Sequence, residues 1–111
     1  MAARLRRDAR LRDGRDFRRV NRTGVRRASP HFVAVVAPSS PAQGPRLGLA
    51  VSRRVGNAVA RNRVKRRVRE WFRQGRPLLP CGTDWVVIAR AGAAQLEAHA
   101  AARELSELAA R

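Results

Sequence analysis

The apolar residues of the chain recur with two different periods, which predict three strands and three helices. Dense apolar runs predict strands over residues 32–37, 47–52 and 84–90. The first and third of these runs are apolar at successive positions, as is typical of strands that are covered on both faces. Apolar residues at helical spacing predict helices over residues 14–21 and 58–73, and from Ala93 onward.

We expect these elements to form one domain. The chain has 111 residues, which is enough for a single core of modest size, and no internal repeat divides it. Asp13 precedes the first predicted helix as an N-cap residue, so we place the domain at residues 13–111. Residues 1–12 are basic and lack a clear apolar face, and we expect them to form a flexible arm.

The predicted helix over residues 58–73 has one narrow apolar face and is otherwise basic. Asn57 stands at its N-cap position. At about 100° per residue, the apolar side chains fall within an arc of roughly 120°. They belong to Ala60, Val64, Val68, Trp71 and Phe72. Packing against a sheet requires only this arc, so the surrounding basic residues indicate a second role.

The composition points to a large polyanionic partner. The sequence holds 25 lysine and arginine residues against 8 acidic ones, a net charge of +17, and 44% of its residues are hydrophobic. The hydrophobic share excludes a disordered basic tail. No apolar run approaches the roughly 18 residues of a membrane span. The single Cys81 excludes an internal disulfide. We therefore expect a cytoplasmic protein without a membrane partner.

Arginines gather at the start of the basic helix, where positive charge is unfavourable in isolation. A helix N-terminus carries unpaired N–H groups and partial positive charge, and therefore favours anions. Arg53 and Arg54 nevertheless stand just before it, and Arg61 and Arg63 follow in the first turns. Phosphate groups would make this arrangement favourable, because N–H groups and guanidinium groups can then donate to the same anion. The pattern predicts a phosphate-binding surface.

The sequence offers no set of residues for catalysis by the protein itself. His31 and His99 have no partners at metal-ligand spacing, and the carboxylates are scattered. A carboxylate-held two-metal nuclease site is therefore unsupported. We predict no catalytic residue and no metal ligand in this chain.

The segment of residues 47–73 carries a specific motif. It reads LGLAVSRRVGNAVARNRVKRRVREWFR, and it resembles the signature of the bacterial ribonuclease P protein family. Its most specific part is RNRVKR at residues 61–66, preceded by VGNA at residues 55–58. The resemblance extends from Arg10 to Leu96 and so covers nearly the whole chain.

This resemblance implies an α/β (α+β) single-domain sandwich, in which about three helices pack a mixed sheet of about four strands. In this family the βαβ crossover through the basic helix is left-handed, whereas about 98% of such connections are right-handed. The resemblance also implies an RNA-binding subunit of an endoribonuclease. A catalytic RNA with Mg²⁺ removes the 5′ leader of precursor tRNA, and the protein binds that RNA, one to one, and the leader. DNA is not an implied partner.

The resemblance further assigns two sets of site residues. The RNA-contacting set lies in and before the basic helix and consists of Arg53, Arg54, Asn57, Arg61, Asn62, Arg63, Lys65, Arg66 and Arg69. The second set lines a leader cleft between the first helix and the sheet and consists of Phe17, Asn21, Phe32 and Val36. Asn21 stands where many relatives have a second aromatic residue, so stacking there is weaker or is replaced by a hydrogen bond.

Several alternatives stay open at this stage. Phe17 has only Val20 as apolar company on its helix, so it is either a core residue or a stacking platform. Gly48 and Ala50 leave one face of the second strand shallow, either for a cleft or for tight helix packing. A structural ribosomal-type RNA-binding protein would explain the charge equally well, and a stand-alone nuclease is the third hypothesis.

Overall fold

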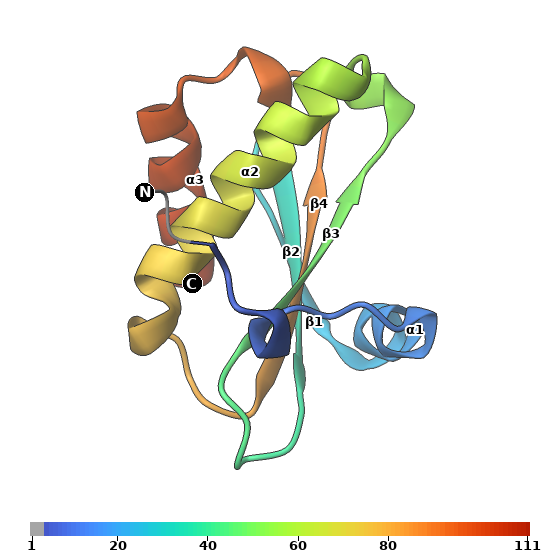
Figure 1. The fold of residues 1–111 in the computed structure, drawn as a ribbon, viewed down its shortest axis with the longest axis vertical. Coiled ribbons are helices and arrows are strands. Elements are labelled where there is room, and N and C mark those ends of the chain that lie inside the picture. Colours follow the sequence, from blue (N-terminus) through green and yellow to red (C-terminus); the bar gives the residue numbers. More distant parts are fainter. Residues whose placement is uncertain (1–3) are drawn as a thin grey trace.

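A four-stranded mixed sheet separates two layers of helices in the computed structural model, which describes residues 4–111 (Figure 1). The helices are α1 (Gly14–Thr23), α2 (Ala58–Gly75) and α3 (Ala98–Ala109). The strands are β1 (Val25–Ala28), β2 (Phe32–Pro38), β3 (Arg46–Val51) and β4 (Thr83–Ala89). The sheet order is β1-β2-β4-β3, with β3 and β4 parallel and the other pairs antiparallel. The expected α/β sandwich is confirmed.

Both faces of the sheet are apolar because both are covered. Successive side chains of a strand point to opposite faces, so β2 contributes to two separate clusters. Phe32 and Ala34 belong to the cluster under α2 and α3, whereas Val35 and Ala37 belong to the cluster under α1. Figure 1 shows α2 and α3 on one side of the sheet and α1 on the other.

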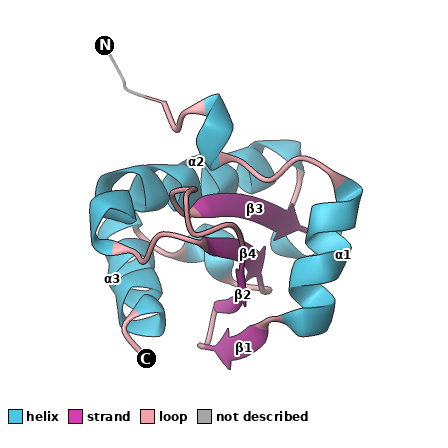
Figure 2. Ribbon diagram, turned by 90° about the horizontal axis from the view of Figure 1, so that it is seen from below, coloured by secondary structure: helices cyan, strands magenta, loops and turns pink. Residues whose placement is uncertain are grey.

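The connection from β3 through α2 to β4 has an unusual hand. The two strands are parallel neighbours. Seen from the α2 side with both strands pointing upward, the chain passes from β3 on the right to β4 on the left (Figures 1 and 2). The crossover is therefore left-handed, as the resemblance implies and against the general rule for parallel βαβ units.

The expectation of a flexible arm is wrong for residues 5–11, which pack on the domain. Leu5, Ala9 and Leu11 are only 5%, 0% and 5% exposed. The backbone N–H of Leu11 donates to the carbonyl of Leu47 in β3 at 2.9 Å. Three apolar residues at irregular spacing match neither the helix period nor the strand period, so the pattern carries no signal for this segment. Residues 1–3 of the expected arm lie outside the described residues.

The last helix begins later than expected. The pattern predicts a helix from Ala93, but only a short 3-10 helix (Ala93–Gln95) forms there, and α3 begins at Ala98. Gly92 has a φ of 93°, a left-handed conformation that favours glycine and makes the turn after β4. Leu96 is extended between the two helical pieces.

Candidate nucleic-acid interface

The apolar arc of α2 fixes this helix on the sheet and so orients its basic residues. Val64, Val68 and Phe72 are buried in the cluster that α2 shares with the sheet. Asn57 begins the helix as predicted, because its Oδ1 accepts a hydrogen bond from the Ala60 N–H at 2.9 Å. The side-chain oxygen of Asn57 is therefore already engaged by the protein.

Arg53 and Arg54 lie in a tight turn just before α2. This 3-10 helix (Arg53–Val55) is anchored by Val55, which is buried, and by Ser52, whose Oγ accepts from the Arg54 N–H at 3.3 Å. Gly56 then adopts a φ of 151°. The turn leaves both guanidinium groups exposed near the N-terminus of α2, where an anion would be favoured.

A cationic groove runs between α2 and the N-terminal segment. It has a volume of about 690 Å³. Its lining consists of Arg4, Leu5, Arg10, Asn62, Arg66, Arg69 and Glu70. Three of the predicted RNA-contacting residues are thus brought together here, and the N-terminal segment adds two arginines from outside the motif of residues 47–73.

Two arginines of this groove oppose each other without a neutralising acid. Within the described residues neither Arg10 nor Arg69 forms an ion pair, and the Nε of Arg10 donates to the Leu5 carbonyl at 3.1 Å. Burial, together with the like charge of Arg10, lowers the pKa of Arg69. A phosphate group in the groove would offset this repulsion and would accept hydrogen bonds from both guanidinium groups in place of water.

Arg63 and Arg67 lie on the opposite flank of α2. The Nη2 of Arg63 donates to the Ala94 carbonyl at 3.4 Å, and Arg67 donates to the carbonyl of Leu96. These contacts tie α2 to the segment before α3. Arg63 therefore faces the segment before α3 and is not part of the lining of the cationic groove.

Phe17 of α1 is half-buried and packs directly on β3. A Cβ at Gly48 would lie 2.6 Å from the Cζ of Phe17, so the small residue permits the close approach of the ring. Phe17 also lines a hollow of about 170 Å³ together with Lys65 and Arg69 of α2. The aromatic ring and the basic helix, far apart in the sequence, thus meet in one place.

The expectation that Phe32 and Val36 line a cleft beside α1 is wrong. Phe32 is 1% exposed and lies in the cluster under α2 and α3, and Val36 packs against the same cluster. The side chains of β2 that face α1 are one position away, at Val33 and Val35, because strand side chains alternate. Asn21, the remaining residue of this set, is exposed on α1.

A buried ion cluster holds α1 against the sheet. Asp84 is 0% exposed and accepts from the Nε and Nη2 of Arg46, each at 2.8 Å, and from Arg19 of α1. The Nη1 of Arg19 also donates to the Pro38 carbonyl at 2.9 Å. The hydrogen bonds to Asp84 raise the pKa of Arg46. This cluster positions Phe17, although the sequence predicts only a strand residue at position 84.

The described residues offer little to a metal ion. No three histidine, cysteine or acidic side chains gather within residues 4–111. Glu70 binds Arg73 and Gln74, and Glu104 binds Ser29 and His31. Across the same residues, no helix is both long and apolar enough to cross a bilayer.

Comparisons with known proteins agree on one family. The sequence model described as Ribonuclease P matches residues 5–111. The ribonuclease P protein component of Syntrophobacter fumaroxidans is 43% identical over 106 residues, covering 94% of this chain and 87% of that protein. The component from Desulfovibrio desulfuricans is 42% identical over 107 residues, covering 94% and 82%.

Solved structures give the same result. The RNase P protein from Staphylococcus aureus has a TM-score of 0.83 at 31% identity, covering 90% of this chain and 91% of that one. The RNase P protein from Thermotoga maritima, in complex with 1-(4-fluorophenyl)-2-thiourea, has a TM-score of 0.84 at 32% identity, covering 91% and 97%.

Proposed function

This chain belongs to the ribonuclease P protein family, and from this premise we propose that two parts of its surface bind two different RNAs. As a member, it is the RNA-binding protein subunit of an endoribonuclease that acts on tRNA precursors, and it partners the ribonuclease P RNA. The two parts are the basic flank of α2 with the turn before it, and the hollow beside Phe17.

The basic flank of α2 binds phosphates of the catalytic RNA. Arg53 and Arg54 point from the turn before α2, and Asn62, Arg66 and Arg69 line the groove beside it. The supporting observation is the excess of unpaired guanidinium groups over carboxylates in this groove. Guanidinium groups donate two parallel hydrogen bonds to a phosphate, which suits them to this task.

The hollow beside Phe17 receives the 5′ leader of precursor tRNA. The single observation that carries this assignment is the meeting of Phe17 with Lys65 and Arg69 in one hollow. An aromatic face stacks on a base and adjacent cations hold its phosphates, which is the general design of single-strand binding sites. Asn21, exposed one turn after Phe17, offers a hydrogen bond where a second ring would stack.

The cleavage chemistry belongs to the RNA, with Mg²⁺ held by the RNA rather than by this chain. Support comes from the engagement of Asp84, Glu70 and Glu104 by cationic or hydroxyl partners inside the protein. We expect one protein per catalytic RNA, a cytoplasmic location and no DNA partner. The exposed thiol of Cys81 suits a reducing compartment.

Reconstitution tests this function. Adding the protein to a bacterial ribonuclease P RNA at low magnesium concentration should restore 5′-leader removal from precursor tRNA. Arg103→Ala is the matched control, because Arg103 is exposed on α3, away from the groove, and it should restore cleavage like the unmodified protein. A folded protein that fails to stimulate cleavage would contradict the proposed function.

A ribosomal-type role is not favoured, because the relatives reported above are ribonuclease P protein components. That role predicts co-sedimentation with ribosomal subunits. The protein should instead co-sediment with the ribonuclease P RNA, and finding it on ribosomal subunits alone would reverse the order of the two hypotheses.

A further inference from the structure

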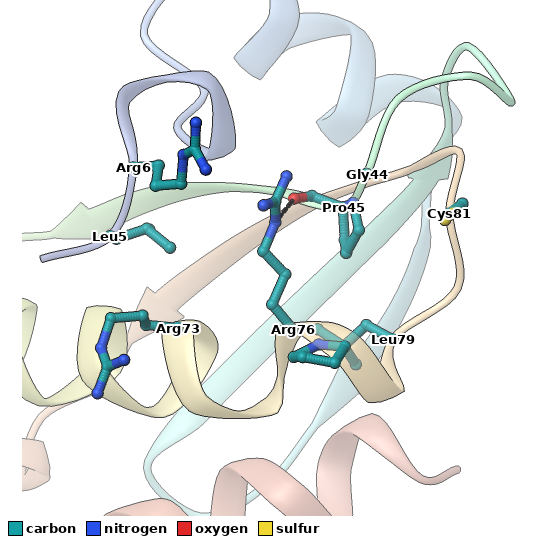
Figure 3. A pocket seen from close by; sticks show the side chains of 9 residues that line it. Leu5, Arg6, Gly44, Pro45, Arg73, Arg76, Leu79 and Cys81 are labelled. Carbon is teal, nitrogen blue, oxygen red and sulfur yellow. Dashed lines mark hydrogen bonds between the residues drawn. The ribbon is translucent and has the colours of Figure 1, made fainter. Parts of the chain in front are cut away.

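The cationic groove does not end at Arg69. Positions 62, 66, 69, 73 and 76 are spaced by four and three residues, so they form one stripe along α2 that continues to the first residue of the 3-10 helix (Arg76–Leu78) after it. The stripe covers residues 62–76, whose 14 steps correspond to about 21 Å at the helical rise. At its far end lies a second hollow of about 460 Å³, between the N-terminal segment, the β2–β3 loop and the end of α2 (Figure 3).

Arg76 is held in place at the centre of this hollow. Its Nε donates to the Pro45 carbonyl at 2.9 Å, and Figure 3 shows its side chain reaching across toward Pro45. A Cβ at Gly44 would lie 2.7 Å from the Arg76 Nη2, so the glycine makes room for the guanidinium group. Within the described residues Arg76 has no acidic partner, so its terminal N–H groups are oriented and remain available.

Two further arginines surround the hollow in different states. Arg73 is neutralised by Glu70, with Nη2 at 2.6 Å from Oε1. Arg6 reaches Asp8 only at 3.6 Å, and both side chains are largely exposed, which is a weak pair. Arg6 and Arg76 are therefore the two groups that can bind an anion here.

The rest of the lining is apolar. Leu5 is 5% exposed and points into the hollow in Figure 3, Pro45 is buried, and Leu79 is half-buried. The oriented guanidinium group of Arg76 and the exposed one of Arg6, beside an apolar floor, match a nucleotide, whose phosphate is anionic and whose base presents a flat apolar face.

We propose that this hollow binds a nucleotide of the catalytic RNA, with its phosphate on Arg6 and Arg76 and its base against Leu5, Pro45 and Leu79. The proposal rests on the proposed function. The occupant is the catalytic RNA because Arg73 and Arg76 in the lining of the hollow continue the α2 stripe that the proposed function assigns to that RNA. The RNA-contacting surface then extends well beyond the family motif.

Cys81 provides a direct test, because it is the only cysteine of the chain, is exposed and lines this hollow. A chelated iron attached to its thiol generates hydroxyl radicals that cut nearby RNA. In the complex with catalytic RNA and precursor tRNA, the cuts should fall in one segment of the catalytic RNA. The control carries the same label on Cys81→Ser with Arg103→Cys and should not cut there. Cuts confined to the leader, or none above the control in a formed complex, would overturn the proposal.

A second experiment measures the affinity of each variant for the catalytic RNA alone. Arg76→Ala should weaken binding about tenfold and reduce the salt slope by about 0.7–0.9. Gly44→Ala keeps the charge but displaces the guanidinium group, and it should weaken binding several-fold relative to Arg103→Ala. Equal affinity of all three variants would refute the inference while leaving the proposed function intact. Absence of binding by the unmodified protein would refute the proposed function itself.

Discussion

Arginine occurs in two opposite electrostatic settings in this molecule. On the α1 side of the sheet, Arg19 and Arg46 converge on the buried carboxylate of Asp84. Beside α2, Arg10 and Arg69 oppose each other with no acid between them. The same side chain thus stabilises the fold in one region and leaves positive potential for a partner in the other. The placement of a few acids, rather than the number of arginines, separates structure from binding.

Removing the buried carboxylate of Asp84 should have the largest effect of the changes that test this comparison. Asp84→Ala leaves two guanidinium groups without their shared partner, and breaking a buried ion pair in this way costs about 3–5 kcal/mol. Urea unfolding followed by circular dichroism measures the loss. Glu107→Ala, at an exposed position of α3, is the control and should change stability little. A loss no larger than that of the control would mean that the cluster does not hold the fold.

Replacing Phe17 tests whether the α1 side of the sheet binds RNA or only stabilises the fold. Phe17→Ala should weaken binding of precursor tRNA relative to mature tRNA by about 1–3 kcal/mol, because one base loses its stacking partner. Competition binding with the holoenzyme measures both affinities. Gly48→Ala is a companion variant that pushes the ring off β3 and should shift the same ratio. Equal losses for the two RNAs would make Phe17 a core residue.

Arg69→Ala sharpens the contrast from the other side. It should weaken binding of the catalytic RNA by about 1–2 kcal/mol and lower the salt slope by about 0.7–0.9, because one phosphate contact is lost. The free protein should keep or slightly gain stability, because a half-buried charge next to Arg10 disappears. Filter binding over a salt series and urea unfolding measure the two effects. A clear loss of stability would place Arg69 with the structural arginines.

Replacing Glu104 should have the smallest effect on stability. Its carboxylate is an example of an acid whose partners are not arginines. Burial alone would raise the pKa of Glu104, but hydrogen bonds from Ser29 and His31 outweigh it and hold this pKa below its ordinary value of 4.5. The ionised carboxylate therefore adds stability above about pH 4.5 that is lost as the pH falls through the lower folded pKa. Glu104→Gln should cost about 1 kcal/mol at pH 7 and flatten the acid limb of the stability profile, measured by urea unfolding at several pH values. An unchanged acid limb would contradict this role.

The elements of the fold could be predicted from the sequence. Which helices cover which face of the sheet could not. The periodicity of α2 correctly separates its buried residues from its basic ones, and Asn57 correctly marks its start. In β2, alternation groups Phe32 with Val36, but both faces of the strand are apolar. Nothing in such a pattern says which face meets α1, so the prediction that Phe32 and Val36 face α1 is wrong.

Contacts that depend on distant partners also escape the sequence. Asp84 binds residues that precede it by 65 and 38 positions, and neither partner stands out among 25 basic residues. The N-terminal segment packs through Leu5, Ala9 and Leu11, whose spacing follows no period. The sequence pattern therefore predicts the α2 side of the groove but not the side that the N-terminal segment supplies.

That N-terminal segment also decides what the outer edge of the sheet can do. β3 is an edge strand, and an uncovered edge offers its N–H and C=O groups to a strand of another molecule. The bridge between Arg10 and Leu47 and the bond from the Leu11 N–H occupy this edge at Leu47. The opposite edge, β1, carries Arg26 and Arg27, whose charges repel a second copy. The N-terminal segment that completes the cationic groove thus also blocks intermolecular β-pairing at Leu47 of this edge.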